Sequence, residues 1–263
     1  MHLAVAATAP FGADVLERLA RHHDVTALLT RPDAPRGRGR KTAPPPAKEA
    51  AERLGIRVLQ PARPEPGLEL GADTVVVAAY GLLIPESVLA QRLWLNVHPS
   101  LLPRWRGAAP VERAIMAGDA ETGVTIHETV KELDAGPIAA QRAFPIGDQD
   151  DAGAVFVKAA ALAVELLDDV LPNPSFTPQD EHGATYAAKI TAADRELDWN
   201  DPPDGLLHKI RALSPHIGAR AELHGRGVTI WRARVAGGRL EPLEVQPDGK
   251  RRMTYDEFLR GLR

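Results

Sequence analysis

Residues 95–107 read LNVHPSLLPRWRG. A short apolar run leads into Asn96 and His98, and two prolines and a glycine then interrupt regular structure. Because side chains alternate between the two faces of a strand, Asn96 and His98 are expected to point the same way. Enzymes with α/β folds often place their chemistry where a strand ends in such a loop. This stretch is therefore either part of an active site or an ordinary strand end.

The segments on both sides predict alternating strands and helices. Leu3–Ala7 and Val25–Leu29 are short apolar runs, and the segment between them has helical spacing. This opening implies a parallel sheet with a right-handed crossover. Asp73–Ala79 is rich in β-branched residues and predicts a central strand. Residues 124–130 alternate between apolar and polar and predict a strand that leads to a tight turn at Asp134.

The pattern changes after the proline-rich stretch that begins at Pro172. We expect residues 1–171 to form an α/β domain, 172–190 a linker and 191–263 a small β-rich domain. Further helices are expected at 47–54, 86–91, 110–117, 152–171 and 206–213, and strands at 57–59, 219–223, 228–233 and 243–245.

Composition narrows the class of protein. The chain has 263 residues, of which 44% are hydrophobic and 25% charged, as in ordinary globular domains. It has no cysteine, which excludes disulfides, thiolate nucleophiles and cysteine zinc sites and fits a reducing compartment. No run approaches the roughly 18 apolar residues of a membrane span, and the N-terminus lacks the basic segment of a signal peptide. We expect a cytoplasmic protein with no membrane partner.

Basic residues are concentrated in two places although the net charge is −3. Residues 205–239 carry seven basic side chains against one acidic, a local charge of +6 that leaves −9 for the remainder. The proline-rich segment 30–46 is expected to be a loop, and it holds the second cluster, which consists of Arg36, Arg38, Arg40 and Lys41. Each cluster fits either a phosphate-binding face or an ordinary solvated surface.

Common cofactor and nucleophile motifs are missing from the sequence. The first strand is not followed by G-x-G-x-x-G, and there is no P-loop, which disfavours a dinucleotide or a bound nucleoside triphosphate. Ser100 does not lie in a G-x-S-x-G nucleophile elbow. His98, His127 and Asp134 lack the spacing of a known metal motif, so no metal is expected.

An amide donor, an imidazole and a carboxylate together suit acyl transfer to an amine. If successive strands end at one edge of a parallel sheet, Asn96, His98 and Asp134 converge there. The amide and a protonated imidazole can stabilise an oxyanion, each donor being typically worth on the order of 3 kcal/mol. The imidazole and carboxylate can take the proton that the amine loses. Each residue taken alone also has an ordinary reading, as a turn cap, a core histidine or a turn residue.

Longer stretches carry a resemblance to a known family. LNVHPSLLPRWRGAAP, followed by AGDAETGVTI and LDAGP, resembles the folate-dependent formyltransferase family. Within it, TRPDAPRGRGRK, VVVAAYGLLIP, ATYAAKITAADRELDW and KIRALSPHIGA resemble the branch that acts on methionyl-tRNA. The resemblance implies a Rossmann-like catalytic domain with a mostly parallel sheet, then a small OB-like β-barrel. The barrel is expected to be abridged, because the stretch between Arg234 and Leu243 is short.

The resemblance also implies roles for individual residues. Formyl transfer from 10-formyltetrahydrofolate to the α-amine of charged initiator tRNA would use Asn96, His98 and Asp134 as catalytic residues. The folate co-substrate would contact the segment Ser100, Leu101, Leu102 and Pro103. The tRNA would be bound by Arg36, Arg38, Arg40 and Lys41, since phosphate contacts need charge and reach more than base readout.

Two alternatives remain open, and the expected assembly state is a monomer. The chain is either this transferase, or a formyltransferase for a small amine such as a nucleotide-linked amino sugar, or a non-catalytic RNA-binding relative. A glycinamide-type activity is disfavoured, because it needs neither the basic loop nor a second domain.

Overall fold

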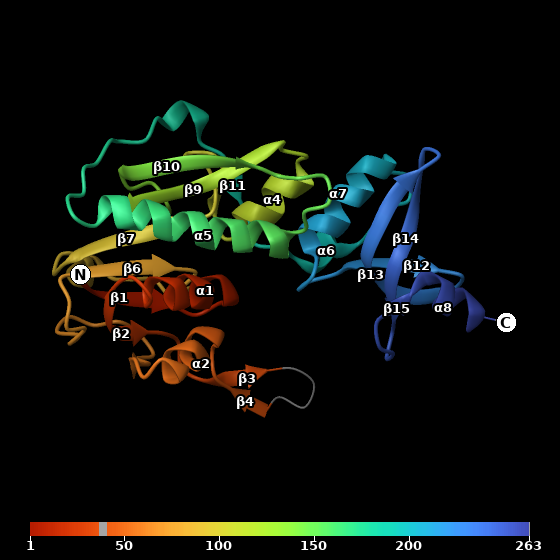
Figure 1. The fold of residues 1–263 in the computed structure, drawn as a ribbon. Coiled ribbons are helices and arrows are strands. Elements are labelled where there is room, and N and C mark those ends of the chain that lie inside the picture. The colour runs from red at the N-terminus through yellow and green to blue at the C-terminus, as the bar shows by residue number, and fades with distance from the viewer. Residues whose placement is uncertain (37–40, 263) are drawn as a thin grey trace. The chain divides into compact units, whose positions relative to one another are not determined.

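The computed structural model describes residues 1–36 and 41–262 (Figure 1). They form two compact units that both draw on distant parts of the chain. The first consists of Met1–Arg106, Gly123–Ala143 and Val157–Thr185. The second consists of Gly107–Thr122, Phe144–Phe156 and Tyr186–Arg263.

A seven-stranded sheet in the order β10-β9-β7-β6-β1-β2-β5 is the centre of the α/β part. The five strands from β7 to β5 are parallel, which confirms the expected mostly parallel sheet. Their bounds are β1 His2–Ala7, β2 Asp24–Leu29, β5 Arg57–Leu59, β6 Thr74–Ala78 and β7 Leu93–His98. β9 (Glu121–Glu128) pairs with β7 in the antiparallel direction, and β10 (Ile138–Pro145) forms the edge beyond it.

Small and β-branched side chains allow the central strands to be covered on both faces. β1 is buried from Leu3 to Ala7, and β6 is buried from Val75 to Ala78. The remaining helices of this part are α1 (Pro10–Leu19), α2 (Pro46–Arg53), α3 (Glu86–Leu89) and α5 (Ala152–Val170). α1 lies so close to β6 that a Cβ added to Gly12 would come within 2.2 Å of the carbonyl oxygen of Ala78.

The basic, proline-rich segment that was predicted as a loop contains a short hairpin. β3 (Ala34–Arg36) pairs with β4 (Lys41–Ala43), and Arg36 is the register partner of Lys41. Pro35 fits this two-stranded ribbon because both strands are edges, where a missing N–H is tolerated. Two further short strands are β8 (Arg106–Gly107) and β11 (Tyr186–Ala187), and a 3-10 turn covers Glu181–Gly183.

The second unit is built around a four-stranded antiparallel sheet in the order β12-β13-β14-β15. It confirms a small β domain after the α/β domain, although two of its strands are longer than predicted. A turn at Gly237 and Gly238, with φ values of 58° and 72°, joins β13 to β14 as type I′ hairpins require. The bounds are β12 Ala219–Leu223, β13 Arg226–Ala236, β14 Arg239–Pro247, β15 Met253–Thr254, α4 Pro110–Met116, α6 Ala192–Arg195, α7 Pro203–Leu213 and α8 Tyr255–Arg260.

The core of this unit lies between α7, α8 and the sheet. Leu206 and Ile210 of α7 pack in one cluster with Ile230, Val245 and Phe258. Across residues 1–36 and 41–262, no helix is long and apolar enough to cross a membrane.

A substitution at Gly12 tests the packing of α1 against β6, and the same substitution at Gly205 of α7 is its control. Gly12→Ala is expected to lower the free energy of unfolding by about 1–3 kcal/mol, because the new methyl group would overlap the carbonyl of Ala78. Gly205→Ala in α7, where nothing lies within 4 Å, should instead raise it by about 0.5–1 kcal/mol. Urea unfolding measures both, and destabilisation by the two variants alike would contradict the close approach of α1 to β6.

Candidate active site

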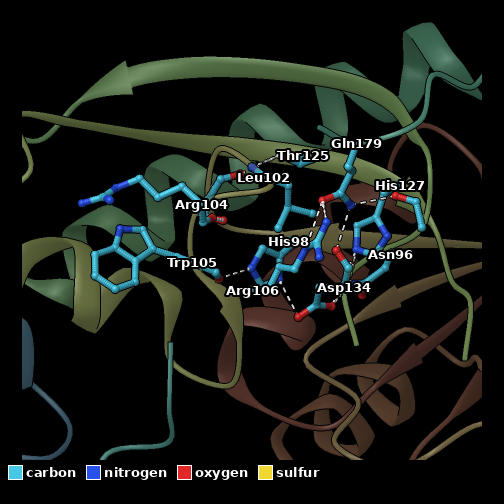
Figure 2. Close-up of polar contacts among 12 residues, drawn as sticks. Asn96, His98, Leu102, Arg104, Trp105, Arg106, Thr125, His127, Asp134 and Gln179 are labelled. Atoms are coloured by element: carbon cyan, nitrogen blue, oxygen red, sulfur yellow. Dashed lines mark hydrogen bonds and ion pairs between the residues drawn. The ribbon is translucent and has the colours of Figure 1, made fainter. Parts of the chain in front are cut away.

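Asn96 and His98 lie on the same face of β7, as the alternation predicts. His98 is 4% exposed, and Asn96 is half-buried. The register of β7 against β9 places Asn96 opposite His127. The neighbouring strand therefore contributes a second imidazole to this face (Figure 2).

Asp134 reaches the same place by a route that the sequence did not predict. We expected successive strands to end at one edge, but β9 is antiparallel to β7, so Glu128 at its end lies opposite Leu95. The connection from β9 to β10 turns back toward β7 through Asp134, whose φ of 50° is in the left-handed region. Asparagine and aspartate tolerate this region better than most residues with a Cβ.

The carboxylate of Asp134 lies close to the polar groups of Asn96, His98 and His127. The Asn96 Nδ2 donates to its Oδ1 at 3.3 Å, and the Nδ1 of His98 lies 3.6 Å from its Oδ2. The Nε2 of His127 lies 3.7 Å from Oδ1. The side chain of Asp134 is only 12% exposed, so these interactions are little screened by water. The three residues singled out in the sequence are thus brought together in space.

Hydrogen bonds fix which nitrogen of each imidazole carries the proton. A carbonyl oxygen only accepts, so the Nε2 of His98 donates to Trp105 O at 2.8 Å and its Nδ1 faces Asp134. The Nδ1 of His127 donates to Glu128 O at 2.9 Å. Its Nε2 accepts from the Asn96 amide at 2.9 Å. The two histidines therefore have opposite tautomers.

Burial keeps His127 neutral. Loss of solvation lowers the pKa of His127 to about 4, although the Asp134 carboxylate acts in the opposite direction. The neutral ring orients the Asn96 amide without adding a positive charge to the site. Sequence reasoning considered His127 only as a metal ligand and missed this role, because the role depends on the strand register.

The segment Ser100–Pro103 forms a turn that is held by hydrogen bonds to Arg104 and Thr125. The Ser100 hydroxyl is fully buried and donates to Arg104 O at 2.7 Å. Leu102 is 3% exposed, and its N–H donates to the Thr125 hydroxyl. Leu101 and Pro103 are half-buried. Side-chain contact with a ligand is therefore available at Leu101 and Pro103 rather than at Ser100.

The predicted cationic residues lie apart from this cluster in the sequence. Arg38 and Arg40 are outside the described residues. Arg36 and Lys41 end and begin the two paired strands, β3 and β4, and only their backbone is described. Part of the basic excess of the second unit is neutralised, since Arg220 pairs with Asp248 and Arg234 with Glu241. Within the described part of the chain, no three histidine or acidic side chains are arranged to hold a metal ion.

Comparison with known proteins identifies the family of the chain. Residues 1–171 match the model of the family described as formyl transferase, and residues 189–239 match that of the formyl transferase C-terminal domain. The chain belongs to the formyl transferase family. It is 40% identical to the methionyl-tRNA formyltransferase of Methylococcus capsulatus, over 98% of this chain and 96% of that protein.

Solved structures share the fold of this formyl transferase. The methionyl-tRNA formyltransferase of Clostridium thermocellum superposes with a TM-score of 0.68 at 15% identity, over 94% of this chain and 98% of that one. HypX of Aquifex aeolicus, in complex with tetrahydrofolic acid, superposes with a TM-score of 0.65 at 20% identity. The match covers 98% of this chain and 46% of HypX.

The low pKa of His127 predicts acid sensitivity of the fold. An unfolded histidine has a pKa near 6.5, whereas burial holds the pKa of His127 at about 4. Between these values the unfolded chain binds a proton that the folded chain does not, so the free energy of unfolding falls by roughly 3 kcal/mol as the pH is lowered from 6.5 to 4. His127→Gln should flatten this pH dependence in denaturant titrations. His182→Gln, whose parent side chain is 98% exposed, should not, and equal slopes in parent and His127→Gln would contradict the assignment.

Proposed function

We propose that this chain transfers the formyl group of 10-formyltetrahydrofolate to the α-amine of methionyl-tRNA, using the charged initiator tRNA as acceptor and acting as a cytoplasmic monomer. The observation that carries the proposal is the convergence of the Asn96 amide, the His98 imidazole and the Asp134 carboxylate at one half-open place on β7. Formyl transfer to an amine needs an oxyanion stabiliser and a proton acceptor, and this cluster supplies both.

Asn96 is assigned to the formyl oxygen. Its Nδ2 makes a 2.9 Å bond to His127 and a longer, 3.3 Å bond to Asp134. The longer bond is the one that a developing oxyanion would replace, while His127 continues to hold the amide in place. His98 presents Nδ1 to the same space, because its Nε2 proton is donated to Trp105.

Asp134 is assigned to the proton that the attacking amine loses. One carboxylate oxygen accepts from the Asn96 amide, and the other lies 3.6 Å from the unprotonated Nδ1 of His98, so the carboxylate can act as a proton acceptor beside the proposed formyl site. As the C–N bond of the formyl donor breaks, the leaving nitrogen needs a proton in return. The Nδ1 of His98, 3.6 Å from Asp134, is placed to pass it on.

Substrate contacts extend the proposal to the surrounding segments. The folate would bind against the turn Ser100–Pro103, through the half-buried Leu101 and Pro103 and the backbone between them. The basic residues Arg36, Arg38, Arg40 and Lys41 would contact tRNA phosphates. Residues 1–171 would form the domain that catalyses formyl transfer, and residues 191–263 would form a domain that supports tRNA binding. Residues 172–190 would link these two domains.

Replacing the Asp134 carboxylate by an amide tests its role without changing its shape. Asp134→Asn is expected to lower the rate of formyl transfer from 10-formyltetrahydrofolate to methionyl-tRNA by at least about 100-fold, because an amide cannot accept the amine proton. Asp169→Asn, at a position whose parent side chain is 73% exposed, is the matched control and should retain parental activity. Near-parental transfer by Asp134→Asn, at unchanged thermal stability, would refute the proposed chemistry.

Salt dependence distinguishes tRNA from a small amine as acceptor. A polyanionic acceptor releases counterions when it binds, so KM for methionyl-tRNA should rise steeply with salt, whereas a nucleotide-linked amino sugar would show a weak dependence. Arg38→Ala should raise KM for tRNA and reduce the salt slope by about one, with KM for the folate unchanged. The exposed Arg63→Ala serves as control. A salt-independent acceptor, or tRNA binding without any transfer, would favour the alternatives.

A further inference from the structure

The turn that carries Asp134 is held by a residue 45 positions further along the chain. The Nε2 of Gln179 donates to Asp134 O at 2.8 Å and to Gly136 O at 2.7 Å. These two bonds use both protons of the amide and bridge the residues on either side of Ala135. They hold the backbone where Asp134 has its left-handed φ of 50°.

Gln179 is itself oriented by a buried arginine. Arg106 is 3% exposed and donates to Gln179 Oε1 from Nε at 3.1 Å and from Nη2 at 2.8 Å. The guanidinium has only donors and the two backbone carbonyls only accept, so the amide of Gln179 fits in one orientation alone. The outer edge of Arg106 forms a bidentate pair with Glu181, at 3.0 and 2.8 Å.

The same segment also holds the partner of the catalytic imidazole. Trp105, whose carbonyl accepts the Nε2 proton of His98, has a φ of 63° and donates its N–H to the Thr185 hydroxyl at 2.8 Å. The next residue, Arg106, donates its N–H to Thr185 O at 2.9 Å. Residues 179–185 therefore fix both the carbonyl that orients His98 and the turn that presents Asp134.

We propose that Gln179 is a positioning residue, which sets the Asp134 carboxylate against Asn96 and His98 by clamping the Asp134–Gly136 backbone, with Arg106 as its support. This inference rests on the proposed formyl transfer for its catalytic consequence, but the clamp itself is a property of the free protein. Without the two donors, Asp134 is able to leave the left-handed conformation, which L-residues rarely adopt without support. The carboxylate then spends less time in the reactive geometry, where small displacements are costly to the rate.

Two substitutions of similar size test whether the hydrogen-bond donors of Gln179, rather than the volume of its side chain, are needed. Gln179→Leu removes all its hydrogen bonds, and Gln179→Glu keeps an acceptor for Arg106 but turns an oxygen toward two carbonyl oxygens. Both are expected to reduce kcat at least tenfold with KM for either substrate changed less than about twofold, because the residue acts through Asp134. A protonated glutamic acid regains one donor, so kcat of Gln179→Glu relative to the parent should rise as the pH is lowered, whereas the ratio for Gln179→Leu should stay constant.

Amide hydrogen exchange measures, in the free protein, how firmly the hydrogen bonds of Gln179 hold the turn at Asp134–Gly136. In Gln179→Leu, exchange of residues 129–137 should be at least tenfold faster than in the parent, while exchange of β7 stays unchanged. Gln246→Leu is the matched control, since Gln246 likewise bridges an N–H donor, Trp231 Nε1, and a backbone carbonyl, Lys250 O, in the other unit. Gln246→Leu should leave both the exchange of residues 129–137 and kcat unaltered.

The outcomes are decisive for the clamp independently of the reaction. Faster exchange in residues 129–137 combined with a selective loss of kcat supports the clamp. Unchanged exchange, or unchanged kcat, overturns it, and so does a parallel loss of kcat, KM and melting temperature, which would indicate only a structural role. If the parent protein shows no formyl transfer, the function proposed above fails while the exchange experiment still tests the clamp.

Discussion

The left-handed backbone of Asp134 is the constraint on which the site depends. A carboxylate delivered by the turn between two antiparallel strands would ordinarily point to solvent beyond the sheet edge. The φ of 50° and the absence of a side chain at Gly136 allow the turn to return toward β7, since a Cβ at Gly136 would come within 1.8 Å of Glu128 O. The site is thus a consequence of a tight, packed turn rather than of a strand end.

The two histidines have different hydrogen-bonding roles in the cluster. His127 is buried and neutral, and it serves as an acceptor that orients the Asn96 amide. His98 donates its Nε2 proton to a backbone carbonyl, which leaves Nδ1 facing the carboxylate. The hydrogen bonds that orient Asn96 and the two imidazoles each join one donor to one acceptor, and together they favour a single arrangement of these side chains. Pre-organised donors of this sort lower barriers because they need little rearrangement during the reaction.

Sequence patterns predicted the parts of this arrangement that depend on local periodicity. The alternation in β7 placed Asn96 and His98 on one face, and the β-branched run identified β6. The convergence of Asp134 with Asn96 and His98 was predicted for the wrong reason, since β9 is antiparallel to β7 and does not end at the same edge. The direction of a strand depends on long-range pairing that a single apolar run does not encode. β10 was missed, since its residues are mostly half-buried or exposed and lack an apolar alternation.

Residues that act across long separations were beyond the reach of such patterns. His127 required the register of β9, and Gln179 and Arg106 required the return of a segment expected to be a linker. The family resemblance pointed to the proposed catalytic residues but not to the residues that support them. Part of the basic surface expected from charge counting is compensated by ion pairs, which only the folded arrangement of Arg220 and Arg234 reveals.

The cluster functions as described only if His127 is a neutral acceptor for Asn96 while His98 carries its proton on Nε2. Nitrogen-15 NMR of the imidazole rings measures this directly in the free protein. The expected result at neutral pH is a proton on Nδ1 of His127 and on Nε2 of His98, with His127 remaining neutral as the pH is lowered to about 5, because its pKa is about 4. Titration of His127 near the ordinary histidine value, or a proton on its Nε2, would contradict the account.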